Sequence, residues 1–228
     1  MNKKLTILAL STAALFSSHV FSAELPDNLQ WQTNDTAPTF ASSKATFGGS
    51  YRTYTLSFPQ TFRTVGPDSN GAFRAWILEA NLPPLIKHPN TGEWLPGLAQ
   101  SWAFGDDNKT VYFKLNPKAT WSDGKPVTAD DYQFMLKLMR STDIVAPWYN
   151  DFFTNEIADI ITFDKNTVGI VSAKARNRDE LIEYTNLMPR PEHFYGKPKV
   201  DKNNDGIDDK FVRKYNFKSE PTTSPYYI

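Results

Sequence analysis

The chain has 228 residues, with 25 basic and 25 acidic side chains and no cysteine. This length allows one sizeable domain or two small ones. The absence of Cys excludes disulfides, thiol catalysis and thiolate metal sites, and nothing in the charge distribution indicates the clustered Lys/Arg surface that binds nucleic acid.

Residues 1–23 predict a secretory signal peptide. Lys3 and Lys4 precede an uncharged, largely apolar run over residues 5–16, and small residues end the segment at Ala23. This order is typical of an export signal, and about a dozen apolar residues are too few for a membrane-spanning helix, which takes roughly 20. Cleavage is expected after Ala23, with cleavage after Ser22 as the alternative. Because no Cys follows to carry a lipid, we expect a soluble periplasmic protein without a lipid anchor.

The first part of the mature chain predicts an arm, a strand and a helix. Residues 24–49 are rich in Pro, Asn, Asp and Thr and predict an extended arm on the surface. Residues 50–58 alternate in polarity, which predicts the first strand. Residues 72–81 predict a helix, capped from residues 69–71, with Phe73 and Ile77 on one face.

Two hairpins, a strong helix and a further pair of strands follow. Residues 85–94 predict one hairpin, and residues 100–104 with 110–115 predict a second, since turn-forming residues separate the apolar runs. Thr128 and Asp131 have the spacing of a capping box, which predicts a helix beginning at this point and ending near Met139. Strands are expected at 156–163 and 167–171, and a short helix at 178–184.

Three linked segments carry a family resemblance: residues 98–102 (LAQSW), 106–115 (DDNKTVYFKL) and 121–132 (WSDGKPVTADDY). They resemble the signature of bacterial family 5 extracellular solute-binding proteins, the peptide, oligopeptide and nickel receptors of ABC importers. Three more stretches resemble the oligopeptide and microcin C receptor subgroup, namely residues 62–71 (FRTVGPDSNG), 144–150 (IVAPWYN) and 220–227 (EPTTSPYY). The resemblance implies an α/β, type II periplasmic-binding-protein-like fold, a peptide or oligopeptide ligand, an ABC importer permease as partner, a monomer and no enzymatic activity.

The resemblance also carries an expectation about domains. Family members usually run well beyond twice this length and close two lobes around a ligand. Residues 50–228 are therefore expected to be the N-terminal part of lobe I, with a mixed sheet and flanking helices, and the second lobe is expected to be absent. Such a truncated fragment would bind ligand weakly, because half of the burial and the hinge closure are lost.

Four residues are candidates for ligand contact: Phe58, Arg63, Trp148 and Tyr149. The resemblance implies that the aromatic side chain after Pro147 faces the ligand main chain, with packing under a second lobe as the alternative. Phe58 ends the first predicted strand, where relatives approach the ligand, and a core Phe is its alternative. Arg63 has a guanidinium that can hold a carboxylate bidentately, and a solvated loop Arg is its alternative.

Residues 201–209 follow the first nine positions of a calcium-binding loop. Oxygen ligands are expected from Asp201, Asn203, Asp205, Ile207 and Asp209, with Ile207 acting through its carbonyl. The twelfth position, where a bidentate Glu is usual, is Val212. The alternative is an acidic, flexible turn. A bound calcium would be structural, and no other cofactor is expected.

Three functions are weighed. A periplasmic peptide receptor of an ABC importer is the first, and a calcium-stabilised secreted binding module is the second. The third is a secreted hydrolase, for which Asp and Glu are abundant, although the sequence has no Gly-x-Ser-x-Gly or His-Glu-x-x-His motif.

Overall fold

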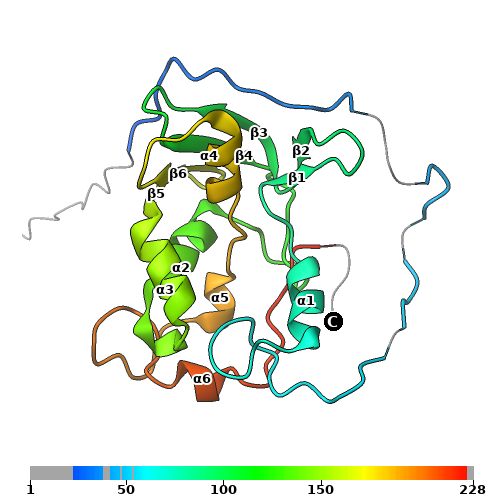
Figure 1. Cartoon of the computed structure of the whole chain (residues 1–228), viewed down its shortest axis with the longest axis vertical. Helices are drawn as coiled ribbons and strands as arrows, with labels where there is room; N and C mark the ends of the chain where they lie inside the picture. Colours follow the sequence, from blue (N-terminus) through cyan, green and yellow to red (C-terminus); the bar gives the residue numbers. More distant parts are fainter. Residues whose placement is uncertain (1–22, 38–41, 47, 53, 225–228) are drawn as a thin grey trace, which may run out of the picture.

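The structure, a computed structural model, describes residues 23–37, 42–46, 48–52 and 54–224. The predicted signal peptide, except Ala23, lies outside the described residues. A four-stranded sheet forms the centre, in the order β3-β4-β6-β5, with β3 at Ala99–Phe104, β4 at Thr110–Leu115, β5 at Ile157–Asp164 and β6 at Thr167–Ser172 (Figure 1). Every strand pair in it is antiparallel, where a mixed sheet was expected. The two-stranded ladder of β1 (Leu85–Lys87) and β2 (Trp94–Pro96) is also antiparallel.

The predicted hairpins are confirmed, and local turn chemistry explains the β3–β4 hairpin. The Asp107 carboxylate accepts the backbone N–H groups of Lys109 and Thr110, each at 2.9 Å, and the Thr110 hydroxyl at 2.6 Å. Asn108 adopts the left-handed conformation, at φ 54°, that Asn tolerates better than most residues. Because the turn fixes the register, Phe113 of β4 faces Trp102 of β3.

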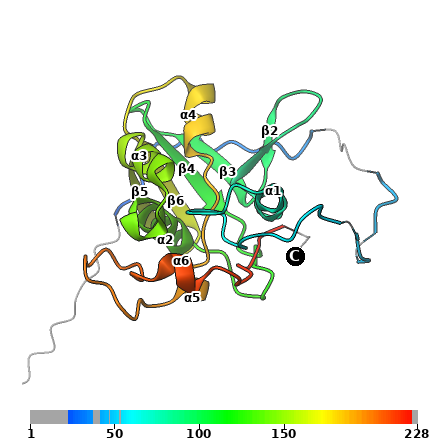
Figure 2. The ribbon, with the colours of Figure 1, turned by 60° about the horizontal axis from the view of Figure 1, so that its bottom comes forward.

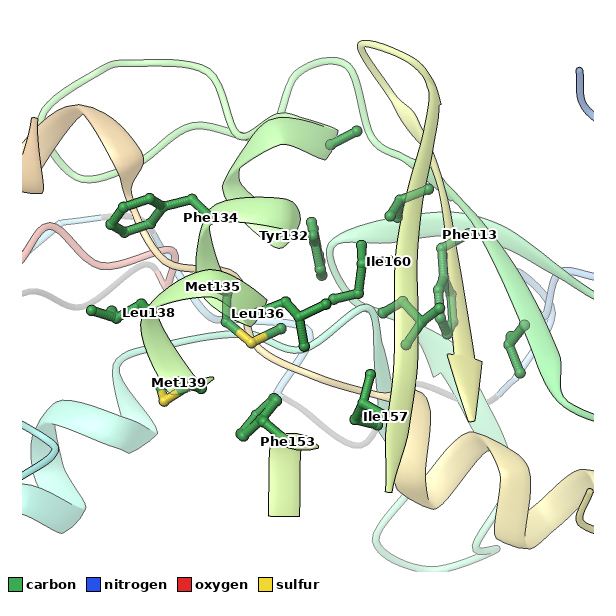
Figure 3. Close-up of a cluster of buried hydrophobic side chains, with 14 of the residues drawn as sticks. Phe113, Tyr132, Phe134, Met135, Leu136, Leu138, Met139, Phe153, Ile157 and Ile160 are labelled. Carbon is green, nitrogen blue, oxygen red and sulfur yellow. The ribbon is translucent and has the colours of Figure 1, made fainter. Parts of the chain in front are cut away.

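The predicted helix after Thr128 is confirmed as α2 (Ala129–Arg140). The capping box is present, with both reciprocal bonds between Thr128 and Asp131. The α2 side chains Tyr132 and Met135 are fully buried in one core with Ile157 and Ile160 of β5 (Figure 3). Burial of an apolar side chain such as Met135, Ile157 or Ile160 contributes roughly 1.5–3 kcal/mol, so this contact holds α2 to the sheet.

The described chain has three more helices of eight or nine residues. They are α1 (Ala72–Glu79), α3 (Pro147–Asn155) and α4 (Arg178–Thr185). Helices α1 and α4 were predicted, and α3 was not. Its start carries the usual signal of Pro at the first helical position. Shorter turns complete the set: η1 (Thr142–Ile144), α5 (Glu192–Tyr195) and α6 (Phe211–Lys214).

The strand predicted at residues 50–58 is wrong for the described residues of that segment, which exclude residue 53. The segment has no ladder partner, and its large side chains are exposed: Tyr51, Tyr54, Leu56 and Phe58. Alternating polarity makes a strand only where a neighbouring strand accepts the backbone hydrogen bonds. The arm before it lies against the sheet, where Gln32 pairs with Trp102 of β3 and the Thr33 hydroxyl donates to the carbonyl of Gln100 at 3.0 Å. No helix in the described ranges is long and apolar enough to cross a bilayer.

The last described segment returns to the start of the folded chain. The N–H of Ser224 bonds to the carbonyl of Ala80 just after α1, at 3.1 Å, and Ser122 and Thr222 exchange hydrogen bonds. Figure 2 shows this segment running beside α1. The Arg190 guanidinium pairs with Glu220 at 3.2 Å, and both side chains are 9% exposed. These contacts anchor α1 from the far end of the chain.

Candidate functional site: a cleft where α1 and α3 begin

A cleft of about 670 Å³ opens between the loop before α1 and the start of α3. Its lining comes from two stretches of chain: Gln60, Gly66, Pro67, Asp68, Ser69, Asn70, Gly71 and Arg74 from one, and Val145, Ala146, Pro147, Trp148 and Tyr149 from the other. Two of the three stretches that resemble the oligopeptide receptor subgroup therefore meet at one place. The cleft size falls in the range usual for small-molecule and peptide sites.

Arg63 supports the loop before α1 from the protein interior. Its side chain is buried, with the residue 5% exposed, and its guanidinium donates to the carbonyls of Val65 at 2.6 Å and Pro67 at 2.8 Å. Burial lowers the pKa of this guanidinium, and the nearby Asp68 opposes the shift. The alternative that Arg63 is a solvated loop residue is therefore wrong, because its buried guanidinium donates hydrogen bonds to the loop backbone.

The loop also approaches the start of α3 at very short range. A Cβ on Gly66 would lie 2.4 Å from the carbonyl oxygen of Ile144, and Gly66 has a φ of 85°. On the other side, Val145 adopts φ 51°, which is strained for a β-branched residue. Strained backbone is concentrated at functional sites, where the surrounding structure holds it.

The two predicted aromatic residues lie on the first turn of α3 and line the cleft. Trp148 is 69% exposed. Tyr149 is half-buried, and its hydroxyl accepts a hydrogen bond from Arg74 of α1. Arg74 in turn donates through Nε to the carbonyl of Thr64 at 2.7 Å. This Arg74–Tyr149 link ties the two sides together, and the sequence analysis missed Arg74.

The charges at the cleft come from two helix ends and two side chains. Helices α1 and α3 both begin at its wall, at the cap residues Gly71 and Ala146, without a side-chain cap and without an acidic residue in the first turn. Uncapped helix N-termini carry free N–H groups and partial positive charge, which suit carbonyl or carboxylate oxygens. Arg74 adds a positive charge, and Asp68 supplies a negative one.

Phe58 does not join these residues. It is 80% exposed and is absent from the cleft lining, which the chain reaches two residues later at Gln60. The core alternative for Phe58 is wrong, since the ring has no cover in the described structure. Its role in ligand contact stays a prediction.

The acidic loop at residues 201–209 lies apart from this cleft. Asp201 accepts the N–H groups of Asp205 at 3.0 Å and Gly206 at 2.8 Å, and Asp209 accepts the N–H of Lys202 at 2.9 Å. Asn203 bonds to Asp143, at 2.9 Å.

The acidic loop is not assembled as a metal cage. Burial and the carboxylates of Asp205, Asp209 and Asp201 raise the pKa of Asp143, against the hydrogen bond from Asn203. Among the described residues, no group of three or more His, Cys, Asp or Glu side chains is arranged to hold a metal ion. Calcium binding by Asp201, Asn203, Asp205, Ile207 and Asp209 stays a prediction.

Comparison with known proteins places the chain in a family. Residues 93–224 match the bacterial extracellular solute-binding proteins, family 5 Middle. A probable ABC transporter-binding protein from Deinococcus radiodurans is 26% identical over 99% of this chain and 36% of its own length. The periplasmic oligopeptide-binding protein OppA from Haemophilus influenzae is 33% identical over 58% of this chain and 24% of its own length.

Solved structures agree on the fold. NikZ from Campylobacter jejuni, in complex with Ni(L-His), matches with a TM-score of 0.53 at 17% identity, over 73% of this chain and 30% of its own. OppA from Haemophilus influenzae, solved with the peptide RPPGFSPFR, matches with a TM-score of 0.50 at 23% identity, over 64% of this chain and 32% of its own. The chain thus spans about a third or less of the length of these relatives. The match over residues 93–224, more than half of the sequence, shows that the chain belongs to the bacterial extracellular solute-binding proteins of family 5.

Proposed function

We propose that this chain takes part in peptide uptake, as the lobe I portion of the peptide-binding receptor of an ABC importer. The observation that carries the proposal is the cleft itself, where residues 66–74 and 145–149 meet around an exposed Trp148. Relatives named as binding proteins of ABC transporters and of oligopeptides support it. This proposal includes a peptide ligand, the permease of an ABC importer as partner, a monomeric state and a periplasmic location.

The chemistry of the cleft suits a peptide main chain. The uncapped starts of α1 and α3 offer N–H groups to carbonyl or carboxylate oxygens, and Arg74 offers a further donor. The Trp148 ring adds apolar, aromatic area beside these donors. Main-chain hydrogen bonds of this kind allow varied peptides to bind, because they do not depend on the peptide's side chains.

Calorimetric titration of the purified mature protein with short peptides tests the proposal. Saturable heat, with no new amino termini released during prolonged incubation, is the expected result. Release of cleaved peptide would favour the hydrolase. Saturable binding to a full-length relative but no detectable heat with this chain, at any peptide tested, would contradict the proposal.

A further inference from the structure

A column of stacked groups runs from the cleft into the body of the protein. Trp148 and Phe152 of α3 lie face to face, with ring centroids 5.7 Å apart and planes at 9°. Phe152 stacks in turn on Tyr184 of α4, at 5.9 Å and 21°. The guanidinium of Arg176 closes the column 3.4 Å from the centroid of the Tyr184 ring.

The inner end of this column is firmly held. Arg176 is 8% exposed at its side chain and forms ion pairs with Glu156 and Glu180. It also bonds through Nε to the Ser172 hydroxyl at 3.1 Å. Guanidinium stacking on a ring is favourable, and more so where water is excluded. These contacts hold the Tyr184 ring in one orientation, and the Phe152 ring that stacks on it is held in turn.

The outer end is the large, exposed ring of Trp148. Trp148 and Phe152 are four residues apart on α3, so their side chains meet on one face of the helix. Tyr149 packs against Trp148 with ring centroids 5.0 Å apart and planes at 89°. Trp148 is still 69% exposed and lines the cleft, so a ligand can reach the exposed part of its ring there. An exposed Trp free to change rotamer would lose conformational entropy when it binds a ligand.

We propose that Phe152, Tyr184 and Arg176 are positioning residues that hold the exposed ring of Trp148 as a stacking platform for a planar side chain of the bound peptide. This inference rests on the proposed function for its ligand. It adds three residues outside the cleft lining and names an aromatic side chain as the group that the platform prefers. Preorganisation of this kind raises affinity by lowering the ordering cost of binding.

The test compares Tyr184→Leu with the conservative Tyr184→Phe, each in the wild type and in Trp148→Ala. Two peptides are used, tetra-alanine and the same peptide with one Ala replaced by Phe. Tyr184→Leu is expected to weaken binding of the Phe peptide about 3- to 10-fold in the wild type, the scale of one aromatic pair, and to have no further effect in Trp148→Ala. Tyr184→Phe should match the wild type, and tetra-alanine should be little affected.

A second readout does not depend on any ligand. The near-ultraviolet circular dichroism of Trp148, taken as the difference from Trp148→Phe, should collapse in Tyr184→Leu and persist in Tyr184→Phe. An unchanged Trp148 signal in Tyr184→Leu would overturn the positioning role even if peptides bind. If Tyr184→Leu lowered the affinity equally in the wild type and in Trp148→Ala, the positioning role would be overturned as well. A Trp148 signal that collapses in Tyr184→Leu, together with no peptide binding by the wild type, would confirm the positioning role and contradict the stacking role and the proposed function.

Discussion

The indole Nε1 of Trp121 lies 3.2 Å from Oδ2 of Asp131, inside the signature that identified the family. The same carboxylate accepts the N–H of Thr128 at 2.9 Å and the N–H of Glu192 at 3.1 Å. One buried side chain thus joins the turn at Trp121, the start of α2 and the start of α5. Burial raises the pKa of Asp131, and these hydrogen bonds oppose the shift. These contacts give the signature a structural role.

Replacement of Asp131 by Ala is expected to lower the free energy of unfolding by about 2–4 kcal/mol. Loss of a helix cap costs about 1 kcal/mol, and leaving buried donors unpaired costs about 1–3 kcal/mol more. Urea unfolding measures the difference. Asp130→Ala is the matched control, because Asp130 is exposed in the same helical turn. Equal losses for the two variants would contradict this account of the signature.

Replacement of Glu220 by Gln is expected to cost about 3–5 kcal/mol of unfolding free energy, because it leaves the buried Arg190 charge without its partner. In the wild type the Tyr195 hydroxyl donates to the Glu220 carboxylate at 2.7 Å. In the variant this hydroxyl has only a neutral amide oxygen as its acceptor. The exposed pair of Lys87 and Glu183 supplies the control. Glu183→Gln should change the unfolding free energy by less than about 1 kcal/mol. A small effect of Glu220→Gln would show that the Arg190 pair does not anchor the last segment.

Acid is expected to remove a stabilising contribution from Asp208. The Lys214 ammonium, 2.8 Å away, and the N–H groups of Lys199 and Lys210 lower the pKa of Asp208 from 3.8 to about 2. Because the folded pKa is the lower one, the contribution is present above about pH 4 and is lost as the pH falls towards 2. It amounts to at most about 2 kcal/mol. Urea unfolding of wild type and Asp208→Asn at pH 7, 4 and 2.5 should show a gap that closes in acid, whereas a constant gap would refute the assignment.

Calcium is expected to raise the melting temperature of the wild type through the loop at residues 201–209. A divalent cation would relieve the repulsion among Asp143, Asp201, Asp205 and Asp209, which raises the pKa of Asp143. Asp201→Asn should lose most of the calcium response and keep a similar melting temperature in chelator. Magnesium at equal concentration controls for ionic strength. An identical response of both proteins to calcium would exclude this loop as the site.

Local signals in the sequence predicted most of the elements. The capping pattern of Thr128 and Asp131 and the turn at Asp107 act within a few residues, and both appear in the structure as expected. The start of α3 at Pro147 carried a readable signal that was overlooked. The strand expected at residues 50–58 failed because pairing depends on a distant partner, which the described structure does not supply.

The sequence predicted only part of the candidate site. Trp148 and Tyr149 were found through the resemblance, and both line the cleft. Arg74 was missed, because its bond to Tyr149 joins residues 75 positions apart. The burial of Arg63 and its bonds to backbone carbonyls could not be predicted, since they depend on tertiary packing, and its contact with a ligand carboxylate stays a prediction.

The central claim is that the cleft beside Trp148 binds peptide. Calorimetric titration of Trp148→Ala against Trp31→Ala tests it most directly. Trp31 is an equally large indole that contacts Lys114 on the sheet and does not line the cleft. Trp148→Ala is expected to weaken peptide binding about 10-fold or more, the scale of a lost aromatic contact at a binding hot spot, and Trp31→Ala is expected to leave it unchanged. Equal affinities for the two variants would contradict the account.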